Sequence, residues 1–340
     1  MKLTKGMNIG GYLSQCIHTP EHYKTFIVED DIKKISEWGF DHVRLPVDYE
    51  VIEDEIGNAK IDGYKIIDKI VSWCKTYNLN IIIDLHKAFG YDFNNAGNIS
   101  ENNLFHSKSL QNRFISLWKT IAKAYGNCNN VAFELLNEVV EDENADTWNS
   151  LIEKTVSAIR EIAPESPIIY GGIQWNSAQT MKFLKKPKHN NIIFTFHFYE
   201  PLLFTHQKAY WVKTINKTKD IFYPDDMELY KAESALIGAQ GQPTVNSDVQ
   251  TMGAEFMEKI ILDAIKTAKE YGVELYCGEF GVIDRAPEKD TVRWFKDISS
   301  IFNKHQIGFS LWTYKNKDFG ITNEHYDNVR DEILKTLTDC

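Results

Sequence analysis

The sequence has few cysteines and no excess of positive charge, and each shortage excludes a class of protein. Its 340 residues include five cysteines, an odd number without a CxxC pair. This argues against a disulfide framework and against a structural zinc site. The net charge of −10 argues against nucleic acid or an anionic membrane surface as a partner. A neutral polymer is compatible with that charge.

Targeting and membrane signals are also missing. The opening stretch MKLTKGMNIGG has no apolar core followed by a cleavage site. No apolar run approaches the length that spans a bilayer. We therefore expect a cytoplasmic protein without a membrane partner, and we expect it to be a monomer. A secreted protein whose leader has been removed would show the same sequence.

Aromatic residues, in contrast, are plentiful. They make up 13% of the chain and include eight tryptophans and sixteen tyrosines. Many of them must belong to the core of an ordinary globular protein, which a hydrophobic content of 43% also indicates. Such a supply also suits the binding of sugars, because the C–H faces of sugar rings stack on aromatic planes.

Strand-like and helix-like segments alternate along the whole chain. Apolar, strand-like runs occupy residues 7–11, 42–47, 80–86, 131–138, 167–172, 191–199, 275–282 and 308–314. Helical patterns separate them, for example at residues 62–77 and 254–271. Eight strand–helix units in one chain of this length predict a closed (β/α)8 TIM barrel. A doubly wound open sheet is the alternative, but the first turn, NIGGYLS, does not match GxGxxG.

Residues 200–253 break this alternation. They show weak periodicity and contain the polar stretch GAQGQPTVNSD. Uninterrupted loops of such length are uncommon in compact domains and are usually functional or disordered. We therefore predict one catalytic domain, residues 1–340, with residues 200–253 as an insertion subdomain at the barrel mouth after the sixth strand.

Polar side chains stand at the C-terminal ends of the predicted strands. The fourth run, VAFELLNE, is apolar and then ends in an amide and a carboxylate. In a barrel all these strand ends converge on one pocket, where catalysis takes place. Each residue alone has a structural explanation, such as a satisfied core histidine or a turn. Together they predict a functional site. The strand-end residues are Arg44, His86, Asn137, Glu138, His197, Tyr199, Glu279 and Trp312.

Two carboxylates among these groups match the chemistry of glycoside hydrolysis. One carboxylic acid protonates the leaving oxygen, and a second carboxylate lies on the other side of the sugar. An arginine keeps one carboxylate ionised, burial keeps the other protonated, and an amide can bind the sugar 2-hydroxyl. A metal bound by His86, His197, Glu138 and Glu279 is an alternative. No HxH or HExxH spacing occurs, so we expect neither metal nor organic cofactor.

Several motifs make the chain resemble a known family. NIGGYLSQ, GFDHVRLPVDY, DLH, FELLNE, FHFYEP, FTHQKAYW, LYCGEFGV and LWTYK follow one another in order. This pattern is similar to glycoside hydrolase family 5, the cellulase family, and especially to the clostridial endoglucanase C group. The resemblance implies that Glu138 is the acid/base and Glu279 the nucleophile. It further implies that Arg44 and Tyr199 contact the nucleophile, and that Trp312 floors the subsite of the sugar that becomes attached.

The chain departs from that pattern at a few positions. Val139 stands where many members have proline, and Lys87, Thr313 and Glu200 stand where a histidine, an asparagine and an amide are expected. The resemblance implies a retaining endo-β-1,4-glucanase acting on cellulose-type or mixed-linkage β-glucan. A β-mannanase or exo-acting β-glucosidase on the same barrel remains an alternative. A catalytically silent sugar-binding barrel is the alternative from another class.

Overall fold

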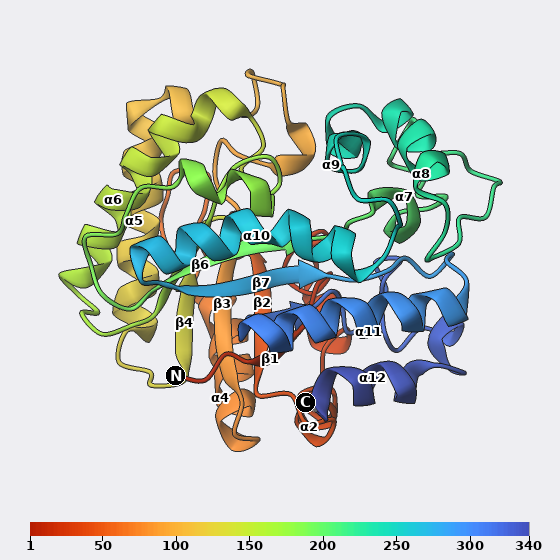
Figure 1. The fold of residues 1–340 in the computed structure, drawn as a ribbon. Coiled ribbons are helices and arrows are strands. Elements are labelled where there is room, and N and C mark those ends of the chain that lie inside the picture. Colours follow the sequence, from red (N-terminus) through yellow and green to blue (C-terminus); the bar gives the residue numbers. More distant parts are fainter. Residues whose placement is uncertain (340) are drawn as a thin grey trace.

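The computed structural model describes residues 1–339, and their strands form one closed parallel barrel (Figure 1). Each strand pairs with the next, and β8 pairs with β1 to close the ring. The predicted (β/α)8 fold is confirmed. The strands are β1 (Lys5–Asn8), β2 (His42–Asp48), β3 (Asn80–Lys87), β4 (Val131–Glu134), β5 (Ile168–Gly171), β6 (Ile192–Phe198), β7 (Glu274–Phe280) and β8 (Gly308–Leu311).

The helices lie outside the barrel and turn one apolar stripe toward it. In α4, for example, the buried residues Ile67, Ile70, Val71 and Cys74 recur at helical spacing. The long helices are α2 (Glu29–Glu37), α4 (Ile61–Thr76), α5 (Lys108–Tyr125), α6 (Ala145–Arg160), α10 (Ala254–Tyr271), α11 (Glu288–His305) and α12 (Arg330–Thr338). None of the described helices has the length and apolar character needed to cross a membrane.

Some predicted bounds were wrong. The fourth strand ends at Glu134 and not at Glu138, because the chain leaves the ladder after Leu135 N–H donates to the Ile169 carbonyl at 2.9 Å. The sequence predicts a short helix at residues 177–184, and the structure has the 3-10 helix η4 (Ala178–Phe183) there. Two short helices, α1 (Pro20–Thr25) and α3 (Tyr49–Ile52), were not predicted.

The barrel interior changes from apolar to polar along the strands. Its lower layer is a buried cluster of one residue from each of five strands: Ile82, Ala132, Ile169, Ile193 and Tyr276. Side chains on one face of a strand recur every second residue. Asp84 and His86 therefore stand one and two layers above Ile82, on the same inward face. The same alternation that places apolar side chains in the lower layer therefore places polar side chains at the barrel mouth.

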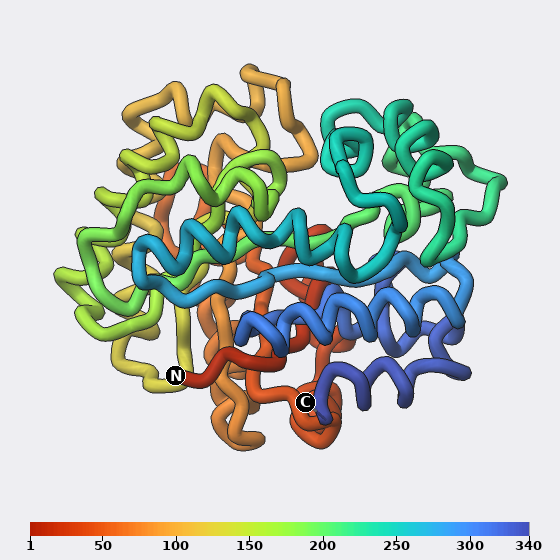
Figure 2. The backbone as a smooth tube through the Cα atoms, in the orientation of Figure 1, coloured from red at the N-terminus to blue at the C-terminus, as the bar shows by residue number. Residues whose placement is uncertain are grey.

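Residues 200–253 fold into short helices: α7 (Leu202–Thr205), α8 (Met227–Ser234), η5 (Ala235–Gly241) and α9 (Gln242–Val245). Figures 1 and 2 show them grouped at one corner, across from α5 and α6. Tyr223 ties the segment to α11, because its hydroxyl donates to Asp297 at 2.7 Å and its N–H donates to Asp290 at 3.2 Å. That this segment is a separate subdomain stays a prediction.

Candidate active site

The loop that follows β4 places Glu138 at the barrel mouth. Trp118 Nε1 donates to the Leu135 carbonyl at 3.0 Å, and Asn137 N–H donates to the Leu85 carbonyl of β3 at 3.0 Å. The Tyr91 hydroxyl donates to the Glu138 carbonyl at 3.2 Å and accepts from Val140 N–H at 2.8 Å. Glu138 has a φ of 37°, which a non-glycine residue rarely adopts. The bonds on both sides of it hold this conformation.

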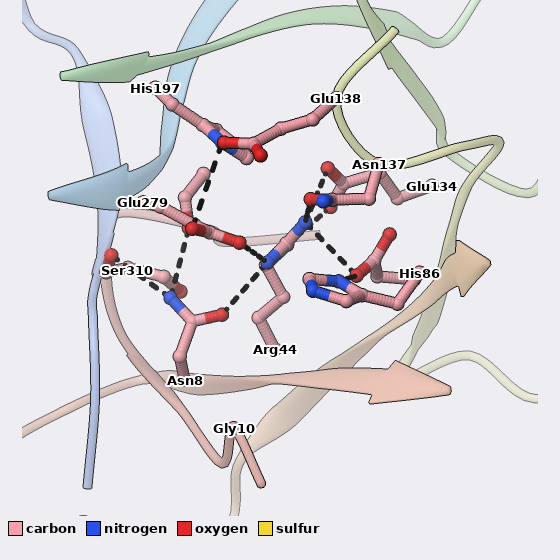
Figure 3. Close-up of polar contacts among 12 residues, drawn as sticks. Asn8, Gly10, Arg44, His86, Glu134, Asn137, Glu138, His197, Glu279 and Ser310 are labelled. Atoms are coloured by element: carbon pink, nitrogen blue, oxygen red, sulfur yellow. Dashed lines mark hydrogen bonds and ion pairs between the residues drawn. The ribbon is translucent and has the colours of Figure 1, made fainter. Parts of the chain in front are cut away.

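Arg44 is the centre of the buried charge network beneath the mouth (Figure 3). It is completely buried and reaches three acids: Glu134 at 2.7 Å, Glu279 at 2.7 Å and Asp84 at 3.0 Å. Burial disfavours its charge, but these acids outweigh burial and raise the pKa of Arg44 well above its ordinary value. The remaining N–H groups donate to the side-chain oxygens of Asn8 and Asn137, both at 3.0 Å.

Glu279 is held from two sides at the end of β7. Arg44 Nη1 donates to one carboxylate oxygen at 2.7 Å, and the Tyr199 hydroxyl donates to the other at 3.1 Å. Burial and the neighbouring Glu279 raise the pKa of Tyr199 well above its ordinary value, so the phenol stays a donor. These contacts fix the carboxylate in one orientation next to a cation.

Glu138 has a different environment. Its carboxylate oxygen Oε1 lies 2.7 Å from His197 Nδ1. Burial lowers the pKa of His197 to about 4, so this imidazole is neutral near pH 7. Burial also raises the pKa of Glu138 to about 7, although electrostatic interactions with His86 and Arg44 act against the shift. Glu138 therefore retains its proton at a pH where an ordinary glutamate has lost it.

His86 and Trp312 form the opposite wall. Their rings stack with centroids 5.9 Å apart and planes within 3°. Because the Gln15 amide nitrogen can only donate, its 3.0 Å contact makes His86 Nε2 an acceptor. The ring proton then lies on Nδ1, which donates to Asp84 at 2.6 Å. Gly10 permits the Trp312 position, since a Cβ there would stand 2.6 Å from Trp312 Cη2.

These side chains open into a cleft of about 1330 Å³. Seven of the eight predicted site residues line it, and Arg44 lies beneath, reaching the cleft through Glu279. Among the described residues, neither Asn137 Nδ2 nor His197 Nε2 has a hydrogen-bond partner, although both atoms are buried. A buried polar atom usually has one. Both groups are thus suited to bind hydroxyls of a molecule in the cleft.

Glu138, His197 and Glu279 are the group in this cleft that could hold a metal ion, since each offers an atom within 4.8 Å of the others. Two of these atoms are already engaged in the bond between His197 and Glu138. Glu279 is further neutralised by Arg44. The donor set therefore fits acid–base chemistry better than metal binding, and the expectation of no metal stays a prediction.

Several functional residues were missed from the sequence. Asp84 orients His86, Glu134 and Asn8 orient Arg44, and Gln15 fixes the His86 tautomer. For Asp84 and Glu134 the signal was an acid within an otherwise apolar strand, two or more positions before a predicted site residue. Burial of such a group requires a partner.

The positions that depart from the family pattern also have contacts. Lys87 pairs with Asp92 at 2.8 Å, and the Thr313 hydroxyl donates to the Asn8 carbonyl at 2.9 Å. Glu200 lines the cleft. Burial raises the pKa of Glu200 to about 7.

Comparison with known proteins identifies the family. Residues 4–318 match the family described as cellulase (glycosyl hydrolase family 5). The chain belongs to glycosyl hydrolase family 5. This family 5 enzyme is 40% identical over 306 residues to cellodextrinase A of Ruminococcus flavefaciens, covering 90% of this chain and 83% of that protein. It is 38% identical over 339 residues to endoglucanase C of Acetivibrio thermocellus, covering 98% and 97%. The family read from the motifs is confirmed.

Solved structures agree with the barrel fold of this glycoside hydrolase. The clostridial cellulose synthase subunit Z of Clostridioides difficile matches with a TM-score of 0.77 at 24% identity, covering 99% of both chains. Endoglucanase Cel5A of Thermotoga maritima matches with a TM-score of 0.74 at 24% identity, covering 98% of this chain and 97% of its own. At this identity the two likenesses show the fold alone.

Proposed function

We propose that this family 5 enzyme is a retaining endo-β-1,4-glucanase that hydrolyses cellulose-type or mixed-linkage β-glucan through a covalent glycosyl-enzyme. The observation that carries the mechanism is the short distance between the two glutamates. One carboxylate oxygen of Glu138 lies within 4.8 Å of one of Glu279. Retaining enzymes place the two carboxyl groups about 5–5.5 Å apart, whereas inverting enzymes leave about 6.5–9.5 Å for a water molecule.

The surroundings of the two glutamates support their assigned roles. Glu279, held in place by Arg44, attacks the anomeric carbon. Glu138 carries a proton below about pH 7 and donates it to the leaving oxygen. The glutamate formed in that step then takes a proton from water, which attacks the glycosyl-enzyme and releases the sugar with its original configuration. Asn137 Nδ2 is placed to bind the sugar 2-hydroxyl.

The cleft supports a polymeric substrate. Its volume of about 1330 Å³ exceeds the range of about 300–1,000 Å³ that is typical of sites for single small ligands. Aromatic rings continue outward from Tyr199 through His206 to Trp211, with centroid distances of 5.0 and 6.1 Å. Such a row of rings suits several consecutive sugars.

A short oligosaccharide is the second candidate substrate, because a relative 40% identical to this chain is named a cellodextrinase. Product analysis distinguishes the two. The panel is barley β-glucan, carboxymethyl-cellulose, mannan, laminarin and cellopentaose. A rapid fall in the viscosity of carboxymethyl-cellulose supports endo action. Release of short products from cellopentaose with unchanged polymer viscosity would contradict it.

The roles of the glutamates are tested by rescue with azide. Glu138→Ala should lose activity on polysaccharide but still form the glycosyl-enzyme from a dinitrophenyl cellobioside, whose leaving group needs no proton. Azide, which needs no general base, should then restore turnover and yield the β-glycosyl azide with retained configuration. Glu279→Ala should give at most the inverted azide. The opposite pair of products would show that the two roles have been exchanged.

A further inference from the structure

A second group of reactive side chains lies at the rim of the barrel, outside the carboxylate site. Cys16 and His18 belong to the loop after β1, and Asp48 ends β2. The Cys16 sulfur lies 3.6 Å from His18 Nδ1, and His18 Nε2 lies 3.3 Å from Asp48 Oδ2. A nucleophile, a base and a carboxylate in this order form the arrangement that activates a thiol.

The proton of this group belongs on the imidazole. Asp48 accepts from the Ser14 hydroxyl at 2.5 Å and from Gln15 N–H at 3.2 Å, so its carboxylate is fixed and ionised. Burial alone would raise the pKa of Asp48, but the hydrogen bonds from His18 and Ser14 outweigh it and lower the pKa. The hydrogen bond to Asp48 contributes most and the hydrogen bond to Cys16 next, and together they raise the pKa of His18 to about 9. The imidazole stands 3.6 Å from the Cys16 sulfur, where its positive charge can stabilise the negative charge that develops on the sulfur as it reacts.

Charged groups of both signs surround Cys16 and His18. Lys317 acts on Cys16 electrostatically, and Lys87 lies 3.9 Å from Asp48. Opposing contributions come from Glu50 and from the Tyr12 carbonyl, to which the protonated thiol donates at 3.3 Å. The Tyr23 hydroxyl lies 2.8 Å from the same ring nitrogen that faces the sulfur. Cys16 is only partly buried.

Gln15 connects this group with the substrate cleft. It precedes Cys16 in the chain, its side chain donates to His86, and its carbonyl accepts from the Lys317 ammonium. Gln15 and Lys317 both line the cleft. Gln15 has a φ of 53°, so its backbone is held in a region that a non-glycine residue seldom adopts. An adduct on Cys16 would be attached one residue from the side chain that bonds His86.

We propose that Cys16 is a reactive thiol that forms a mixed disulfide with a low-molecular-weight disulfide, and that this adduct reversibly lowers the activity of the enzyme through Gln15. In this step the Cys16 thiolate attacks one sulfur of the reagent. A new S–S bond forms, the original S–S bond breaks, and the released thiolate takes up one proton. The thiol reactivity does not depend on the proposed function, whereas its effect on turnover does.

Alkylation at pH 6 tests the reactivity. An ordinary thiol with a pKa of about 8.5 is only about 0.3% thiolate at that pH. Cys128 is also partly exposed and serves as the internal control. We expect iodoacetamide to label Cys16 about tenfold faster than Cys128, as followed by peptide-resolved mass spectrometry. His18→Gln should remove the difference. Equal rates in the native enzyme, or an unchanged difference in the variant, would overturn the proposal.

Oxidised glutathione tests the link to activity, measured as hydrolysis of a dinitrophenyl cellobioside. Native enzyme carrying one adduct on Cys16 should lose activity at least threefold and regain it with dithiothreitol. Cys16→Ser should keep its activity under the same treatment. Full activity in the modified native enzyme would refute the link. If the enzyme hydrolyses no β-glucoside at all, the proposed function fails, but the alkylation result still stands or falls separately.

Discussion

The raised pKa of Glu138 predicts that this residue destabilises the enzyme at neutral and alkaline pH. Glu138 is only 8% exposed, and burial raises its pKa from 4.5 to about 7. Below pH 4.5 the residue is protonated in both folded and unfolded chains, so it costs nothing. As the pH rises from 4.5 to 7 only the unfolded chain loses the proton, and the folded state becomes relatively less stable.

The size of the effect follows from the two pKa values. Each pKa unit corresponds to about 1.4 kcal/mol, so the cost levels off at about 3 kcal/mol above pH 7. Between pH 5 and pH 8 it grows by about 2.5 kcal/mol. Glu138→Gln keeps the shape of the side chain and cannot ionise. Its free energy of unfolding relative to the native enzyme should therefore rise by about 2.5 kcal/mol over this interval.

Urea unfolding at pH 5 and pH 8 measures this difference, with the native enzyme compared at each pH. Glu143→Gln is the matched control, because Glu143 is an exposed glutamate five residues further along. The control should show no such rise. A Glu138→Gln variant whose stability relative to the native enzyme is equal at both pH values would refute the reasoning. In the native enzyme, polysaccharide hydrolysis should fall about tenfold from pH 6 to pH 8 as the acid loses its proton.

Three further substitutions test the site. Tyr199→Phe removes a hydrogen-bond donor to the Glu279 carboxylate. It should lower kcat/KM for a dinitrophenyl cellobioside by about 10- to 100-fold, with an unchanged circular dichroism spectrum. Unaltered kinetics would show that this hydrogen bond is dispensable. Gly10→Ala places a methyl group against Trp312 and should raise KM. Gly253→Ala is the control, because a Cβ there has no heavy atom within 4 Å, and it should not raise KM. Equal KM values for the two variants would contradict the packing argument. Trp211→Ala should weaken hydrolysis of carboxymethyl-cellulose more than that of the aryl glycoside, and equal losses would make the ring a stability element.

The fold could be predicted because its signal is local. Buried strands of a parallel sheet and amphipathic helices carry different periods, and eight repetitions leave few topologies. The end of β4 was misjudged for a physical reason. Leu135 and Leu136 are as apolar and as buried as the strand before them, but after the Leu135 N–H bond to β5 the chain is held by Trp118 and by β3. In this stretch the apolar residues indicate burial, but they do not indicate which strand the backbone bonds to.

The site divides in the same way. Residues at strand ends were found because a polar group there has no packing reason. The acids that hold Arg44 from below, Asp84 and Glu134, were not predicted, because only the strand register brings both of them to Arg44. Period-2 alternation does place Asp84 and His86 on one face, so the acid was in principle accessible from the sequence. Gln15 was not, since its position depends on the path of a loop.

The location of Arg44 explains how one barrel mouth can give two glutamates different chemistry. Arg44 touches Glu279 at 2.7 Å, whereas the nearest ionisable partner of Glu138 is the neutral His197. Both acids are buried to a similar extent, and burial raises the pKa of Glu138. Arg44 donates directly to Glu279, whereas its effect on Glu138 does not outweigh that burial. In the proposed mechanism, the carboxylate that Arg44 contacts is the nucleophile, and the one without this contact is the acid.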